Sequence, residues 1–139
     1  EVIYKIIQSS RYFVINIAKA LRSFKYAALG IVYFFKMENN ARIHLLISVF
    51  VITLGIILKL NQDQWLWIGL AICLVITSEM INTCFEKVVD LISPDFNLQA
   101  GKIKDLSAGF VLVTCFFAMV IGAIIFIPKL WPFITKIFT

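Results

Sequence analysis

The sequence predicts an all-α membrane protein, with an N-terminal amphipathic surface helix followed by three transmembrane helices. Of its 139 residues, 61% are hydrophobic and only 15% are charged. The mean hydropathy of +0.94 is far above that of an ordinary soluble domain. Long apolar runs recur at helical length, with the charges gathered between them. We therefore expect a single integral membrane domain over residues 1–139, without a separate soluble domain.

The N-terminal segment predicts a helix along the membrane surface, over about residues 4–36. Apolar side chains such as Ile17, Leu21 and Phe24 recur every three or four positions, opposite Lys19 and Arg22. Four positive charges within about fifteen residues would be costly at bilayer depth, so the helix is expected to lie at the interface. The net charge of +5 is accordingly attributed to anionic lipid headgroups, and no nucleic-acid partner is expected.

Three apolar runs predict the membrane helices, and these cover residues 41–59, 65–92 and 106–127. The first reaches the roughly 20 residues that cross a 30 Å core only if it begins near Ala41. Asp63 is expected to cap the second helix, and Trp65 follows where an aromatic belt would mark the far membrane face. Pro128 and Pro132 are expected to close the third helix.

The distribution of charge predicts the orientation of these helices. The basic N-terminal segment and the loop that carries Lys102 and Lys104 fall on the same side, which the positive-inside rule makes cytoplasmic. We expect a multi-pass protein of the inner (cytoplasmic) membrane. A rise of about 1.5 Å per residue from Trp65 places Glu79 and Glu86 near the cytoplasmic boundary. At that depth a carboxylate can meet both a water-soluble reactant and a lipid headgroup.

The second membrane helix carries the candidate site. At about 100° per residue, Glu79, Asn82, Glu86 and Asp90 fall within a stripe about 80° wide. Glu38, at the mouth of the first membrane helix, adds a third glutamate. Such an oxygen-only set suits Mg²⁺, which is commonly held by one or two carboxylates together with nucleotide phosphates. The competing interpretation is that Glu79, Glu86 and Asp90 form structural salt bridges with Lys87, Arg42 or Lys104.

Other residues have simpler alternatives. Asn82 suits an interhelical hydrogen bond as well as a ligand role. His44 has no second histidine nearby and is interpreted as a packing residue. Phe96 would stack on a nucleotide base or merely pack in its loop. The three cysteines, 73, 84 and 115, lack metal-ligand spacing and are expected to be free thiols. None of the soluble kinase motifs is present.

Taken together, these segments resemble the prokaryotic diacylglycerol kinase and undecaprenol kinase family. The matching blocks are ENNARIH at 38–44, EMINTCFE at 79–86 with VD at 89–90, and GKIKD at 101–105. The resemblance covers roughly residues 19–127. It implies a three-span membrane kinase with a surface helix, assembled as a homotrimer with active sites shared between subunits.

The resemblance also implies individual roles. Glu79 is similar to the family's general base for the lipid hydroxyl, and Glu38 and Glu86 are similar to its Mg²⁺ ligands. Arg42 and Glu79 would contact the lipid substrate. ATP-binding roles are implied for Lys19, Tyr26, Glu38, Asn82, Glu86, Asp95, Phe96, Asn97, Lys104 and Asp105.

The function expected from the sequence is therefore transfer of the γ-phosphoryl group of ATP to a membrane lipid alcohol, with Mg²⁺. Cys84, Phe85 and Ile103 differ from the family pattern, and the segment after Pro128 has no counterpart in it. The acceptor, diacylglycerol or undecaprenol, stays open, although the RIH segment at 42–44 is closer to the undecaprenol branch. The alternatives are an ion- or proton-conducting protein that uses its intramembrane carboxylates, and a non-catalytic membrane subunit.

Overall fold

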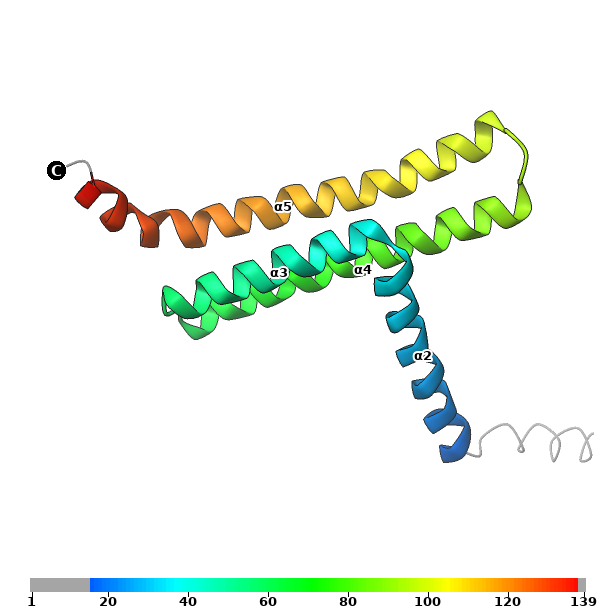
Figure 1. The fold of residues 1–139 in the computed structure, drawn as a ribbon, viewed down its shortest axis with the longest axis horizontal. Coiled ribbons are helices and arrows are strands. Elements are labelled where there is room, and N and C mark those ends of the chain that lie inside the picture. The colour runs from blue at the N-terminus through cyan, green and yellow to red at the C-terminus, as the bar shows by residue number, and fades with distance from the viewer. Residues whose placement is uncertain (1–15, 138–139) are drawn as a thin grey trace, which may run out of the picture. The chain divides into compact units, whose positions relative to one another are not determined.

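The structure is a computed structural model in which residues 16–137 are described, and in that range it contains helices and turns without strands (Figure 1). The chain divides into two compact units, Glu1–Tyr33 and Phe34–Thr139. Within the described range, three helices are long and apolar enough to cross a membrane: Asn39–Ile57, Gln62–Ile92 and Leu98–Pro132. The expected all-α membrane fold is thus confirmed. Part of the expected surface helix, residues 4–15, lies outside the described residues.

The first unit is described through most of helix α2, which spans Ile17–Met37. The helix begins where the Asn16 side chain accepts a hydrogen bond from the backbone N–H of Lys19, at 2.9 Å. Every described side chain of this unit, from Asn16 to Tyr33, is exposed, including the apolar Leu21 and Phe24. An amphipathic helix with an uncovered apolar face suits a membrane surface.

Helix α3 spans Asn39–Ile57 and is separated from α2 by the single extended residue Glu38, with φ −100° and ψ 124°. Its other end is closely packed. A Cβ added at Gly55 would lie 2.8 Å from the ring carbon Cη2 of Trp65, so only glycine lets α3 approach the start of the next helix. Lys59, with φ 50°, then turns the chain back.

Helix α4 spans Gln62–Ile92 and begins with a capping box. The Asn61 side chain accepts a hydrogen bond from the backbone N–H of Gln64, at 2.9 Å, while the Gln64 side chain accepts one from the backbone N–H of Asn61, at 3.0 Å. The expectation that Asp63 caps this helix is wrong. Asp63 lies inside the first turn, where its charge still complements the helix dipole.

Helix α5 spans Leu98–Ile137 and runs back along α4, which is its main packing partner (Figure 1). It begins at Leu98 because the Asn97 side chain caps it, accepting hydrogen bonds from the backbone N–H groups of Gln99 and Ala100. The helix continues through Pro128 and Pro132 instead of ending there. Its ribbon changes direction near its C-terminal end, as proline causes by removing a backbone hydrogen bond (Figure 1).

The apolar core of the second unit lies at the end where α3 turns into α4. Leu60, Ile68, Ile125 and Phe126 are buried there, and residues of α3, α4 and α5 pack around them. The buried face of α4 continues along the helix from Ile68 through Ala71 and Val75. One turn later the same face becomes polar.

Candidate active site

The buried face of α4 changes character between Val75 and Ser78. The next four buried residues along it are polar: Ser78, Glu79, Asn82 and Thr83, before the apolar Val89. Glu79 is only 3% exposed, and a carboxylate is rarely so buried unless other polar groups surround it. Of the polar stripe predicted from the sequence, Glu79 and Asn82 are therefore buried in the bundle, while Glu86 is half-buried and Asp90 is exposed.

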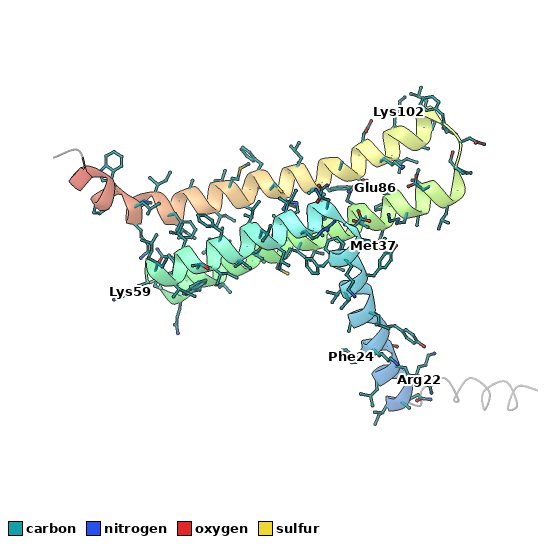
Figure 2. The ribbon with its side chains drawn as sticks, in the orientation of Figure 1. Arg22, Phe24, Met37, Lys59, Glu86 and Lys102 are labelled. Atoms are coloured by element: carbon teal, nitrogen blue, oxygen red, sulfur yellow. The ribbon has the colours of Figure 1, made fainter. Side chains whose placement is uncertain are left out.

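Glu79 is surrounded by groups from the start of α3. The Asn40 side chain is its hydrogen-bonding partner, and His44, one turn further along α3, interacts with it electrostatically. Glu38 and Glu86 are also near enough to interact with its charge. The fold thus brings three predicted glutamates from two helices into one cluster. Figure 2 shows Glu86 on α4, well away from Lys59 at the opposite end of the α3–α4 pair.

Asn82 lies at the centre of a hydrogen-bonded chain. Its Nδ2 donates to Oε1 of Glu86 at 3.1 Å, along α4. Its Oδ1 accepts from the hydroxyl of Ser107 on α5, at 2.7 Å. Asn82 therefore makes the interhelical hydrogen bond weighed from the sequence and at the same time contacts a predicted metal ligand.

Glu38 occupies the N-cap position of α3, yet its side chain makes no capping hydrogen bond. Its Oε1 instead forms an ion pair with Nζ of Lys87 on α4, at 3.0 Å. The Arg42 side chain, one turn into α3, donates to the backbone carbonyl of Glu38 at 3.4 Å. Glu38 is thereby fixed between the two helices.

A second group forms around the connection between α4 and α5. A cavity of about 220 Å³ is lined by Asp90, Lys104 and the loop residues Asp95, Phe96 and Asn97, among others. Lys104 forms an ion pair with Asp90, one of the structural salt bridges considered from the sequence. Phe96 is 97% exposed, so it does not pack on the protein.

Three predicted residues lie outside these contacts. Asp105 is exposed on α5 beside Lys104. Lys19 and Tyr26 are exposed on α2 in the unit Glu1–Tyr33.

The residues present suit Mg²⁺ held together with phosphates. Within residues 16–137, no group of three or more His, Cys, Asp or Glu side chains forms a metal site built from protein alone. Glu38 and Glu86, both close to Glu79, provide two carboxylates. Mg²⁺ commonly keeps several waters and takes its remaining ligands from a nucleotide. The donor set therefore fits a hydrated Mg²⁺ with a nucleotide and does not fit a closed zinc site.

Beside the polar cluster lies an apolar cavity of about 290 Å³ between α3, α4 and α5. Its lining includes His44 and Cys115, both of which interact with the charge of Glu79. The lining then extends along the helices to Gly122 and Phe126. The cavity thus leads from the buried carboxylate towards the apolar core.

Four contributors were not predicted from the sequence: Asn40, Lys87 as the partner of Glu38, Ser107, and His44 as a neighbour of Glu79. A usable signal exists for Asn40 and His44, because residues four apart share a helix face. No spacing in the sequence pairs Ser107 with Asn82, because the two residues lie on different helices.

Fold and site together define a helical membrane protein with a buried glutamate, Glu79, and two half-buried glutamates near it. The profile of the prokaryotic diacylglycerol kinase family matches residues 25–126. This chain belongs to that family.

Two curated relatives share most of the chain. A protein named diacylglycerol kinase from Synechocystis sp. is 37% identical over 111 residues, covering 79% of this chain and 63% of the relative. A protein named undecaprenol kinase from Bacillus subtilis is 34% identical over 109 residues, covering 78% of this chain and 89% of the relative. The match thus spans less than two thirds of the Synechocystis protein.

Proposed function

We propose that this chain is a lipid kinase that transfers the γ-phosphoryl group of ATP to the hydroxyl of a membrane lipid alcohol. The observation that carries the proposal is Glu79, a carboxylate that is 3% exposed on a membrane helix. It interacts electrostatically with two further glutamates and with His44 and Cys115, which line an apolar cavity. Family membership supports the same reaction class. The two relatives bear the names of two acceptors, so diacylglycerol and undecaprenol are both candidates.

Glu79 would act as the general base. It accepts the proton of the lipid hydroxyl while the lipid oxygen bonds to the γ-phosphorus and the bond from that phosphorus to the bridging oxygen of ADP breaks. The products are the lipid phosphate and ADP, and the proton on Glu79 passes to water. The Asn40 amide orients the carboxylate through its hydrogen bond. The apolar cavity accommodates the hydrocarbon tail of the acceptor.

Glu38 and Glu86 would hold Mg²⁺ on the ATP phosphates. When bound, the ion supplies positive charge that offsets the negative charge of the phosphoryl group. Glu38 must then exchange its partner Lys87 for the ion. Lys104 would likewise leave Asp90 to bind phosphate oxygens, while Asp95, Phe96 and Asn97 line the cavity beside it.

We further propose the inner membrane as the location, with the cluster on the cytoplasmic side, because ATP is available there. Arg42 would contact the lipid headgroup, and Asp105 would bind the nucleotide. Lys19 and Tyr26 keep the nucleotide-binding roles that the family resemblance implies for them. A homotrimer with shared sites is part of this proposal. Native mass spectrometry of the protein in detergent checks it, since a monomeric mass would contradict it.

The decisive experiment compares Glu79→Gln with the unsubstituted protein in lipid bicelles. Transfer of label from γ-labelled ATP is measured separately with diacylglycerol and undecaprenol. We expect kcat to fall between about 100- and 10,000-fold, the usual contribution of a general base. Asp63→Asn is the matched control, because it neutralises another acidic residue of the same helix, in its first turn and away from the cluster. Full turnover by Glu79→Gln would reject the assignment of the base.

A further inference from the structure

Ser107 contacts parts of the site on two helices. It lies on α5, is 3% exposed, and places its Oγ 2.7 Å from Oδ1 of Asn82 on α4. The same oxygen lies 2.8 Å from the backbone carbonyl oxygen of Lys104, one turn earlier on α5. Ser107 therefore joins the acidic face of α4 to the segment that carries Lys104.

The chemistry of the two neighbours gives Asn82 one favoured orientation. The Glu86 carboxylate accepts hydrogen bonds and cannot donate them, so Asn82 must turn Nδ2 towards it. Oδ1 of this buried amide then needs a donor of its own. The Ser107 hydroxyl supplies that donor, with its single hydrogen shared between Oδ1 of Asn82 and the backbone carbonyl oxygen of Lys104.

We propose that Ser107 is a positioning residue for phosphoryl transfer, which acts by fixing the Asn82 amide against Glu86. This inference rests on the proposed function. Without the hydroxyl, Oδ1 of Asn82 is buried without a donor, at a cost that favours rotation of the amide or entry of water. Glu86 then loses the partner that orients its carboxylate as a metal ligand. Ser107 itself touches neither the proton nor the phosphoryl group.

Other contacts between α4 and α5 provide a matched control. The Ser78 hydroxyl lies 2.8 Å from the Thr114 hydroxyl, so these residues also link the two helices. Neither residue has an observed hydrogen bond to Asn82 or Glu86. Thr114→Val removes a hydroxyl contact of similar length and leaves the Asn82 chain intact.

The test compares Ser107→Ala, Ser107→Thr and Thr114→Val. Turnover is measured against Mg²⁺ and lipid concentration, and Mn²⁺ binding is followed by electron paramagnetic resonance with a non-hydrolysable ATP analogue. For Ser107→Ala we expect kcat to fall between about 10- and 100-fold, as slight misplacement in a site can cause. We also expect weaker Mn²⁺ binding and an unchanged KM for lipid. Ser107→Thr keeps the hydroxyl, so its kcat and its Mn²⁺ binding should both be close to those of the unsubstituted protein.

The proposal is overturned if Ser107→Ala matches Thr114→Val in kcat and Mn²⁺ binding, because the hydroxyl would then serve helix packing alone. If Ser107→Ala does not fold, Ser107→Cys takes its place as a side chain of similar size with a weak donor. Failure of the proposed function is distinct, since the unsubstituted protein would then show no lipid phosphorylation at all. In that event, the Mn²⁺ titration decides by itself whether Ser107 organises the site.

Discussion

At the scale of single residues, the ion pair between Glu38 and Lys87 places a cation next to a predicted Mg²⁺ ligand. The Lys87 side chain is 52% exposed and that of Glu38 is 20% exposed. A pair this open to water contributes at most about 1 kcal/mol. Lys87 can therefore be displaced by a divalent ion, although it competes with that ion.

Replacing Lys87 should make Mg²⁺ binding easier. For Lys87→Met we expect the Mg²⁺ concentration at half-maximal activity to fall by up to about fivefold, the factor that corresponds to about 1 kcal/mol. Glu38→Gln should raise it instead, because a ligand is lost. A titration of activity with Mg²⁺ at saturating ATP checks both. If Lys87→Met instead raised the Mg²⁺ concentration needed for half-maximal activity, the lysine would be helping to bind the ion or the nucleotide.

The residue pattern on α4 could be predicted from the sequence, because a stripe follows from the period of one helix. Glu79, Asn82 and Glu86 do share a face, and that face is directed into the bundle. Their partners could not be predicted in the same way. Whether Asn82 meets Ser107 or another polar residue depends on how α5 is rotated about its axis, which local sequence does not determine.

At the scale of elements, the tight turn between α3 and α4 depends on Gly55. Gly55→Ala places a methyl group 2.8 Å from a ring carbon of Trp65 and 3.0 Å from Leu60. We expect a loss of about 1–3 kcal/mol in the free energy of unfolding, as is typical of overpacking. Titration with sodium dodecyl sulfate in bicelles measures it.

Gly69→Ala is the matched control for this prediction. A Cβ at Gly69 meets no atom within 4 Å, and alanine favours helix more than glycine does. That variant should be neutral or slightly more stable. Equal destabilisation by the two variants would contradict the packing argument.

The sequence predicts which segments form helices better than it predicts the residues at which those helices begin and end. The apolar runs identify α3, α4 and α5, because each must bury or embed a long hydrophobic surface. The ends depend on side-chain details: Asn61 caps α4 although Asp63 is also a suitable residue type, and Asn97 starts α5 within a loop expected to be a turn. Prolines at 128 and 132 do not end α5, since a helix in an apolar setting retains most of its backbone hydrogen bonds.

At the scale of the whole molecule, the second unit has an apolar core at one end and a polar cluster at the other, with the apolar cavity between them. The family match, residues 25–126, includes all of the cluster and most of that core. This arrangement supports an acceptor with a polar head and a long hydrocarbon tail.

Filling the cavity should therefore discriminate between acceptors by tail length. Ala118 lines the cavity, so Ala118→Leu should raise KM several-fold for a long-tailed alcohol and less for a short-tailed one. One added methylene group in a pocket is commonly worth about 1–3 kcal/mol. Ala123→Leu, an exposed position on the same helix, is the control. Equal KM changes for both tail lengths would place the tail elsewhere.

The change from Val75 to Ser78 on the buried face of α4 has a consequence for how the protein sits in its host lipid. If α4 moved along its own axis, hydrocarbon would meet Glu79 on one side or water would reach the apolar core on the other. The helix thereby sets the height of the Glu79 carboxylate relative to the bilayer surface. Turnover should therefore depend on bilayer thickness, even when the protein itself is unchanged. The thickness can be varied through the acyl length of the surrounding phospholipids.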